Sequence, residues 1–202
     1  MGRLILHMIT SIDGFISDHD DAVNPETQWD EEMQQFYLDR FTTAEAVVFG
    51  RRLYQQYVGH WARVASGEIP PQTGLELRWA TRLLDMPKYV VSTSSPDVAA
   101  NTRILTGDIA AELAERKQKA ADGLLLMCGP ALLAHLTAAR LVDEYMLYVC
   151  PSALGAGTHL FRDISDHVKL SYTRSVSFTT GVNLHIYKPV YPPTSASTVF
   201  ER

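Results

Sequence analysis

The 202-residue sequence has few cysteines, no excess of positive charge and no long apolar run. Its two cysteines, Cys128 and Cys150, lie inside apolar segments, which favours buried thiols in a reducing compartment over a structural disulfide. The formal net charge of −5 argues against nucleic-acid and anionic-membrane partners, because both require a basic surface. No segment approaches the roughly 18 consecutive apolar residues of a membrane-spanning helix. We therefore expect a cytoplasmic protein.

Several motifs that carry chemistry are also missing. The seven histidines show neither the H-E-x-x-H spacing nor a Cys/His ligand pattern, so we predict no metal site. The G-x-S-x-G motif and the P-loop are absent, which argues against the hydrolase and NTPase classes that depend on them. There is no G-x-G-x-x-G either, so the sequence does not predict a Rossmann dinucleotide site.

What the sequence does contain is an alternation of short apolar runs and helix-length amphipathic segments. This alternation predicts an α/β fold with a mainly parallel central sheet and helices on both faces. We expect strands near residues 4–10, 46–49, 88–92, 103–106, 123–127 and 144–151, and helices near residues 30–42, 51–57, 74–84, 109–121 and 130–139.

The last part of the sequence follows a different pattern. Residues 168–178 and 182–188 are joined by Thr179-Thr180-Gly181, which predicts a C-terminal antiparallel hairpin. We expect a single domain over residues 1–188 and a loose C-terminal tail over residues 189–202, where proline, serine and threonine prevail.

One glycine followed by two arginines stands between a predicted strand and a predicted helix. Gly50 lets a ligand approach the backbone closely, and the free amides of a helix start carry partial positive charge. The guanidinium groups of Arg51 and Arg52 can bind a phosphate through paired hydrogen bonds. The segment therefore predicts an anion site, with an exposed arginine pair after an ordinary glycine turn as the alternative.

Other polar or glycine-containing turns follow the predicted strands. The small hydroxyls of Ser92, Thr93 and Ser94 could bind a phosphate or ribose at a strand end, or form a plain serine-rich loop. Gly129 and Pro130 open a helix after an apolar strand, which a structural turn explains equally well.

Two acidic residues stand beside predicted element ends. Asp13 follows the first strand and could orient a substrate or relay a proton, or only cap its turn. Asp30 stands at a helix start, where capping is the more common role and a position facing the cleft is the alternative.

These segments appear in the order of a known family. The sequence resembles the dihydrofolate-reductase-like family, and within it the stand-alone relatives of the reductase domain of the bifunctional riboflavin-biosynthesis deaminase/reductase. The resemblance runs from the first strand to about Lys188. It rests on the segments 11–14, 48–54, 89–94, 128–130, 141–144 and 151–161.

The resemblance implies an NADPH-dependent reductase that transfers a hydride to a C=N or C=O bond of a pterin-like or ribosylaminopyrimidine-like small molecule. It places Asp13 near the reacting end of the cleft, leaves Asp30 as a positional candidate for the proton donor, and suggests a homodimer. It also implies that Arg51 and Arg52 select NADPH over NADH by charge. The cofactor-binding positions it implies are Ile9, Ile16 and Ser17 at the nicotinamide, Gly50, Arg51, Arg52, Leu53, Ser92, Thr93 and Ser94 on the phosphate side, and Cys128, Gly129, Pro130, Ala131 and Leu132 under the pyrophosphate.

Two residues depart from the family pattern. Leu53 stands where members usually carry a threonine that bonds a cofactor phosphate, and Cys128 replaces the first glycine of a Gly-Gly pair. Losing one hydrogen bond to a charged group costs about 1.5–3 kcal/mol, roughly ten- to hundred-fold in affinity. Two alternatives stay open: a nucleotide- or small-molecule-binding module that kept the reductase fold, and an unrelated doubly wound domain such as a flavin binder.

Overall fold

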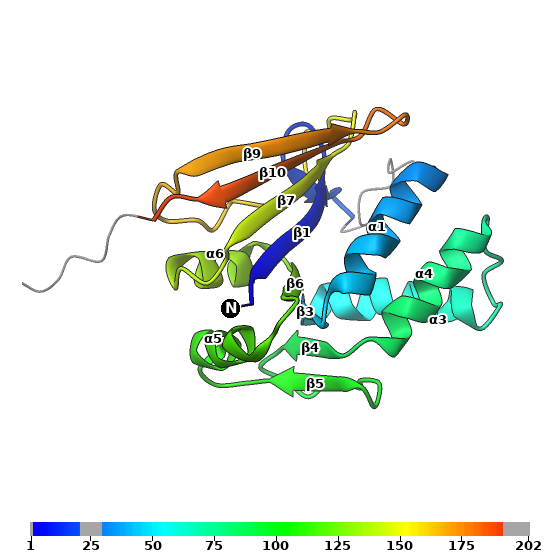
Figure 1. The fold of residues 1–202 in the computed structure, drawn as a ribbon, viewed down its shortest axis with the longest axis horizontal. Helices are drawn as coiled ribbons and strands as arrows, with labels where there is room; N and C mark the ends of the chain where they lie inside the picture. Colours follow the sequence, from blue (N-terminus) through cyan, green and yellow to red (C-terminus); the bar gives the residue numbers. More distant parts are fainter. Residues whose placement is uncertain (1, 21–29, 192–202) are drawn as a thin grey trace, which may run out of the picture.

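The computed structural model describes residues 2–20 and 30–191. Its centre is an eight-stranded sheet with the strand order β5-β4-β3-β6-β1-β7-β10-β9 (Figure 1). The strands are β1 (Leu4–Thr10), β3 (Ala46–Gly50), β4 (Lys88–Val91), β5 (Thr102–Leu105), β6 (Leu124–Met127), β7 (Glu144–Val149), β9 (Leu170–Ser177) and β10 (Asn183–Pro189). The predicted α/β architecture, with a mainly parallel sheet and an antiparallel C-terminal hairpin, is confirmed.

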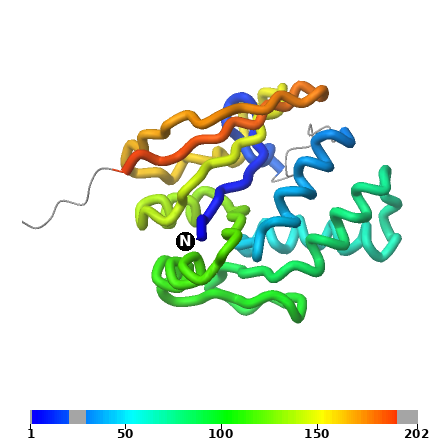
Figure 2. Tube along the Cα trace, viewed as in Figure 1, coloured from blue at the N-terminus to red at the C-terminus, as the bar shows by residue number. Residues whose placement is uncertain are grey.

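The parallel and antiparallel parts of the sheet meet at β7. β1 pairs in parallel with both β6 and β7, and the tube drawing shows its dark-blue trace between these two strands (Figure 2). β10 then pairs antiparallel with β7 on one side and with β9 on the other. The central strands β3 and β6 are buried on both faces, which explains why they read as continuous apolar runs.

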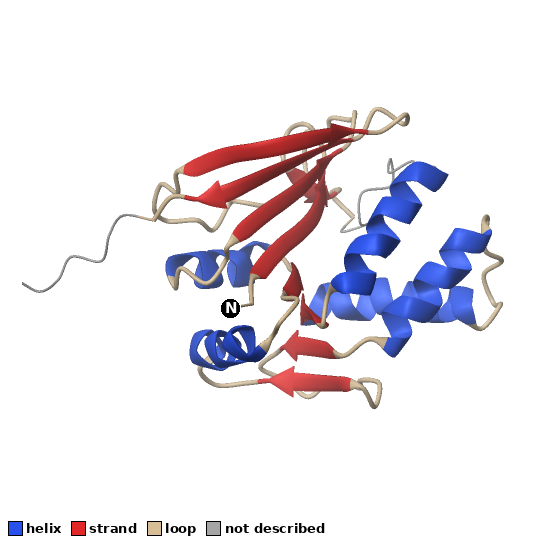
Figure 3. Cartoon of the chain, viewed as in Figure 1, coloured by secondary structure: helices blue, strands red, loops and turns tan. Residues whose placement is uncertain are grey.

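Helices cover both sides of the parallel strands (Figure 3). α1 (Glu31–Thr43), α3 (Gly59–Ala65) and α4 (Gly74–Asp85) lie on one side, and α5 (Ile109–Lys119) and α6 (Pro130–Ala138) lie on the other (Figure 1). The starts of α1, α4 and α5 are capped by the side chains of Asp30, Thr73 and Asp108, each of which accepts a hydrogen bond from a backbone amide. No helix in the two described ranges is both long enough and apolar enough to cross a bilayer.

The helical segment after β3 is longer than the sequence predicts. It comprises α2 (Arg51–Leu53), a π-helical turn η1 (Tyr54–Val58) and α3, and so runs to Ala65 rather than ending near Tyr57. Gly59 does not end it, because its amide still donates to the carbonyls of Gln55 and Gln56. The cost of a helical glycine, about 1 kcal/mol, is offset by the burial of Val58 and Val64 on either side.

Two further findings depart from the expected pattern. A second, two-stranded sheet of β2 (Phe15–Ser17) and β8 (Thr158–His159) was not predicted. The chain does not loosen at residue 189 either: Pro189 belongs to β10, the Val190 amide donates to the Lys169 carbonyl at 2.8 Å, and the Tyr191 hydroxyl donates to the Val142 carbonyl at 3.0 Å. The rest of the expected tail, residues 192–202, lies outside the described residues.

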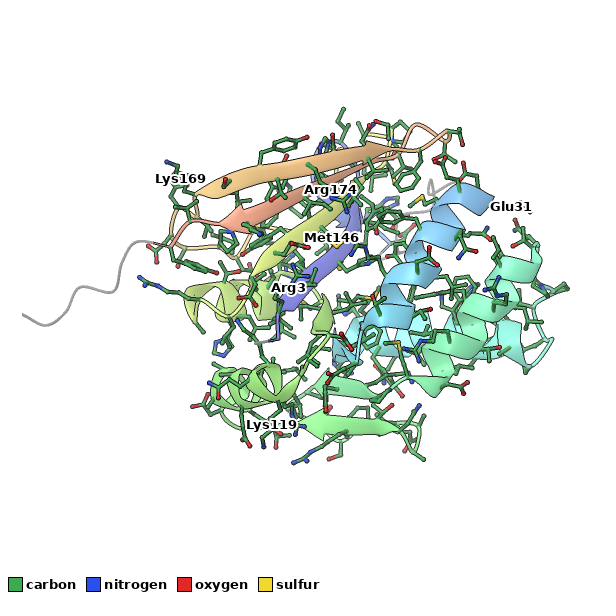
Figure 4. All side chains as sticks on the ribbon, viewed as in Figure 1. Arg3, Glu31, Lys119, Met146, Lys169 and Arg174 are labelled. Atoms are coloured by element: carbon green, nitrogen blue, oxygen red, sulfur yellow. The ribbon has the colours of Figure 1, made fainter. Side chains whose placement is uncertain are left out.

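The side chains separate a buried interior from a polar edge. Met146 on β7 is fully buried, whereas Lys169, just before β9, and Arg174 on β9 are exposed at the outer edge of the sheet (Figure 4). Glu31 lies in the first turn of α1, at the other end of the molecule in this view (Figure 4).

Candidate functional site

A cleft of ≈ 540 Å³ lies where β1, β3 and β6 end. These are neighbouring parallel strands, so their carboxyl ends meet at one edge of the sheet. One wall is α2 with the following π turn, a second is the turn from β6 into α6, and a third is the β2–β8 ribbon. In open α/β sheets, ligands bind in the crevice outside the carboxyl ends of the strands.

Two glycines bring backbone to the surface of this cleft. A Cβ on Gly50 would meet only ordinary contacts, 3.8 Å from the Gly129 amide nitrogen and 3.9 Å from the Cys128 Cβ. A Cβ on Gly129 would meet no atom within 4 Å, so this position opens onto empty space. Gly129 is also the N-cap of the nine-residue helix α6 and provides no side-chain cap. Pro130 has no amide hydrogen and the Leu133 amide donates to the Gly129 carbonyl, so the amides of Ala131 and Leu132 are the ones available to an anion in the cleft.

The ionised side chains along the cleft are all positive. Arg51 and Arg52 open the α2 wall, and Arg162 lies on the β2–β8 side. No aspartate, glutamate, lysine or histidine of the described ranges lines the cleft. The site is therefore cationic in a protein whose formal net charge is −5. Within the same ranges, no group of three histidine, cysteine or acidic side chains is arranged to hold a metal ion.

The other titratable groups along the cleft stay neutral near pH 7. Burial raises the pKa of the Cys128 thiol well above its usual range, so this residue is not a thiolate nucleophile. Burial likewise raises the pKa of Tyr57, although the indole N–H groups of Trp61 and Trp79 act in the opposite direction. The pKa of Tyr37 is raised mainly by burial as well. The cleft thus combines three fixed positive charges with an uncharged floor.

Most of the predicted cofactor positions come together in this cleft. Its lining includes Ile9, Ile16, Ser17, Gly50, Arg51, Arg52, Leu53, Cys128, Gly129, Pro130, Ala131 and Leu132. Ser92 and Thr93 line a second hollow of ≈ 540 Å³, at the ends of β4 and β5, which shares Arg51 with the first. Ser94 lines neither hollow, and its amide instead donates to the Ser92 Oγ at 3.1 Å.

The two predicted carboxylates do not line the cleft. Asp13 accepts hydrogen bonds from the Ser11 hydroxyl at 2.6 Å and from the amides of Leu154 and Gly155 at 3.1 and 2.8 Å. The Ser11 hydroxyl contributes most to lowering the pKa of Asp13, from 3.8 to about 2, followed by the Gly155 amide. Asp30 caps α1 by accepting from the Met33 amide at 2.8 Å. The structure therefore shows a turn-holding hydrogen-bond network at Asp13 and a helix cap at Asp30.

Seven residues that line the cleft are not predicted from the sequence. Two of them, Gln56 and Tyr57, stand four positions after Arg52 and Leu53, a helical spacing that could have indicated them. Thr158 and Arg162 lie on or just after a two-residue strand, which is too short for any periodic signal. The other three are Met8, Tyr37 and Met127.

The fold resembles that of dihydrofolate reductases and of a riboflavin biosynthesis protein. A dihydrofolate reductase from Enterococcus faecalis, solved in complex with NADP(H), aligns with a TM-score of 0.59 at 12% identity and covers 93% of this chain and 96% of its own. A putative riboflavin biosynthesis protein from Shewanella sp. PV-4 aligns with a TM-score of 0.67 at 16% identity and covers 95% of this chain and 100% of its own.

A family model identifies the chain more closely. Residues 3–184 match the RibD C-terminal domain, and the chain belongs to this family. Among curated proteins, the uncharacterized protein YyaP of Bacillus subtilis is 26% identical over 188 residues, which cover 92% of this chain and 94% of YyaP. The family and the structural relatives together support a reductase-type fold.

Proposed function

We propose that the protein is an NADPH-dependent reductase that transfers a hydride to a C=N or C=O bond of a pterin-like or ribosylaminopyrimidine-like small molecule. The observation that carries the proposal is that Arg51 and Arg52 and the open backbone at Gly129 line one cleft. The NADP(H) in the Enterococcus faecalis dihydrofolate reductase supports the same class of cofactor.

The residues present fit a dinucleotide phosphate. Arg51 borders both the main cleft and the hollow of Ser92 and Thr93, so one guanidinium group can serve phosphates on either side. In this proposal Arg51, Arg52 and the two hydroxyls hold the 2′-phosphate end. The first-turn amides of α6 hold the pyrophosphate, because Gly129 leaves the space above them free.

The two departures from the family pattern affect this fit differently. Leu53 lines the cleft and offers no hydrogen bond, so it weakens the phosphate site. Cys128 is completely buried, and its Cβ faces Gly50, so the extra side chain adds no exposed atom to the cleft wall. We therefore expect Leu53 to weaken cofactor binding and Cys128 to have little effect on it.

When bound, the cofactor supplies the hydride, and the chain supplies position and shielding from water. Ile9 and Ile16 form an apolar stretch of the cleft wall, which suits the flat nicotinamide ring and excludes water around it. Ser17 provides a hydroxyl beside them. In this proposal Asp13 holds the turn between β1 and β2, and so positions Ile16 and Ser17, rather than reacting itself.

The test is a titration with NADPH and NADH, followed by the fluorescence of the three tryptophans. We expect saturable binding with NADPH strongly preferred. The double variant Arg51→Ala with Arg52→Ala should lower NADPH affinity about ten- to hundred-fold and leave NADH affinity nearly unchanged. Lys169→Ala with Arg174→Ala removes two positive charges from the outer edge of the sheet and serves as the control (Figure 4).

Three results would decide against parts of the proposal. Absence of NADPH binding at millimolar concentration would contradict the cofactor assignment. Equal losses of NADPH and NADH affinity in the double arginine variant would contradict the 2′-phosphate assignment. Saturable NADPH binding without oxidation, across a panel of pterins and pyrimidines, would favour the binding module over the reductase.

A further inference from the structure

Gln56 lies on the cleft wall four positions after Arg52, about one helical turn further along. It belongs to the π-helical turn η1, and π turns are rare and occur frequently at functional sites. Its side chain is exposed, and it is the only side-chain amide that lines the cleft in the described ranges. The wall therefore presents an uncharged group that can both donate and accept hydrogen bonds.

The side-chain amide of Gln56 has no hydrogen-bond partner in the described part of the chain. The preceding residue, Gln55, is different, because its Oε1 accepts from the Arg51 guanidinium at 3.4 Å and it does not line the cleft. The carbonyl oxygen and the N–H groups of Gln56 are therefore available to a ligand. A planar amide can pair with two neighbouring atoms of a ring, accepting from one and donating to the other.

Tyr57, the next residue, adds a flat apolar face to this wall. Its hydroxyl is buried beside the indole N–H groups of Trp61 and Trp79, and neither tryptophan lines the cleft. The part of Tyr57 that reaches the cleft is therefore its ring. Aromatic faces pack favourably against other flat rings. Gln56 and Tyr57 thus place a hydrogen-bonding amide next to a stacking face.

The charges along the cleft favour an uncharged ring. Arg51, Arg52 and Arg162 are positive, and no carboxylate of the described ranges lines the cleft with them, so a protonated ring is disfavoured. The polar edge of an uncharged ring still needs partners, because a donor or acceptor that leaves water unpaired loses affinity. The Gln56 amide can provide a donor and an acceptor to the same edge.

We propose that Gln56 is a specificity-determining residue that binds the edge of an uncharged ring where a carbonyl oxygen and an N–H group stand side by side. This inference rests on the proposed function and narrows its substrate to rings with an unsubstituted amide edge. The Gln56 side-chain N–H donates to the ring carbonyl oxygen, and the Gln56 Oε1 accepts from the ring N–H. The face of the ring stacks on Tyr57.

The experiment uses two pairs of uncharged probes. Uridine is compared with 3-methyluridine, and pterin with 3-methylpterin, so that within each pair a methyl group replaces the hydrogen of the ring N–H. Each compound is titrated calorimetrically into the NADPH-saturated protein and into the cofactor-free protein. We expect the unmethylated member of one pair to bind at least tenfold more tightly, and the pair that shows this gap identifies the ring class.

Variants then assign the gap to the two residues. Gln56→Leu should remove the gap by weakening the unmethylated probe, and it should leave NADPH affinity unchanged. Gln55→Leu is the matched control, since it makes the same change at the neighbouring exposed position outside the cleft and should keep the gap. Tyr57→Leu should weaken both members of the pair alike, because stacking does not depend on the ring N–H. Thermal unfolding of each variant verifies that the fold is intact.

The outcomes separate this inference from the proposed function. A gap that persists in Gln56→Leu, equal affinities within both pairs, or no binding of any probe overturns the role of Gln56. A loss of NADPH affinity in Gln56→Leu equal to that of the probe assigns the residue to the cofactor and also overturns it. Unchanged probe affinities in Tyr57→Leu overturn the stacking contact. Failure of the wild-type protein to bind NADPH contradicts the reductase proposal alone, because the cofactor-free titrations still test Gln56.

Discussion

At the residue scale, Leu53 is an apolar residue in the wall where we propose that a phosphate binds. It is half-buried on the cleft wall directly after Arg52, and it packs against the hydrophobic core. The family pattern places a threonine hydroxyl at this position. The wall therefore has the charge that a phosphate requires but lacks one of its hydrogen-bond donors.

Restoring that donor should strengthen cofactor binding. We expect Leu53→Thr to raise NADPH affinity by about tenfold or more, since a hydrogen bond to a charged group contributes about 1.5–3 kcal/mol. Leu132→Thr makes the same chemical change at another half-buried position of the cleft and should not produce this gain. Equal effects of the two substitutions on NADPH affinity would show that Leu53 does not face a phosphate.

Asp13 gives a second prediction at this scale, concerning pH. Its folded-state pKa, about 2, lies below its ordinary value of 3.8, so its hydrogen bonds stabilise the fold above pH 4 and are lost as the pH falls towards 2. Asp13→Asn should therefore lower the melting temperature at pH 7, and the difference from wild type should shrink at pH 2–3. A difference that is constant from pH 7 to pH 2, measured by circular dichroism, would contradict the role of the ionised carboxylate.

At the scale of elements, the helix caps distinguish the two roles considered for Asp30. Asp30 and Asp108 each cap a helix by accepting from a backbone amide, at 2.8 and 3.0 Å, and Asp30 also accepts a hydrogen bond from the Thr179 hydroxyl. We expect Asp108→Ala to lower the free energy of unfolding by about 1 kcal/mol and Asp30→Ala to lower it somewhat more, and neither to change NADPH oxidation once a substrate is known. Loss of turnover in Asp30→Ala alone would restore this residue as a proton donor.

The sequence predicts those elements that have a clear period or a buried apolar core. β3 and β6 are continuous apolar runs, and Gly50, the last residue of β3, lines the cleft. The β2–β8 ribbon cannot be recognised from the sequence, because strands of three and two residues have no period and pair only through tertiary contacts. The π turn after Leu53 is missed because local propensity does not distinguish it from an α-helix.

The site residues on this ribbon were missed for the same reason. Thr158 and Arg162 reach the cleft only because the ribbon folds against β1, a placement that depends on pairing between distant segments. The environment of Asp13 also depends on distant segments. Its nearest partner, Ser11, is two residues away and donates to Oδ1, but the amides of Leu154 and Gly155, which donate to Oδ1 and Oδ2, come from a loop that the sequence does not place next to it.

At the scale of the whole molecule, the packing of the core affects stability in acid. His7 on β1 is completely buried between aromatic rings, with its Nε2 at 2.9 Å from the Tyr148 hydroxyl. Burial, followed by the positive charge of Arg40, lowers the pKa of His7 from 6.5 to about 3. The folded protein therefore holds this ring neutral at pH values where the unfolded chain binds a proton.

The sign of the effect follows from this difference in proton binding. The free energy of unfolding should fall by up to about 1.4 kcal/mol per pH unit as the pH decreases from 6.5 towards 3, owing to this residue alone. His7→Phe with Tyr148→Phe removes the titrating ring without leaving the tyrosine hydroxyl unpaired. Urea unfolding between pH 7 and pH 4 should show a shallower pH dependence in the double variant, and an unchanged slope would contradict the assignment.

The strand order also determines when the central strands can pair during synthesis. Leu4 of β1 pairs with Leu124, and Ile5 pairs with Glu144, so β1 obtains both of its neighbours from segments more than 100 residues further along the chain. During synthesis β1 therefore has no partner strand until β6 has been made, and its second neighbour is complete only when the chain reaches Val149. Such distant pairing slows folding, because a long loop must close before any contact compensates for its lost entropy. The part of the cleft that Met8 and Ile9 of β1 line is thus completed only late in synthesis.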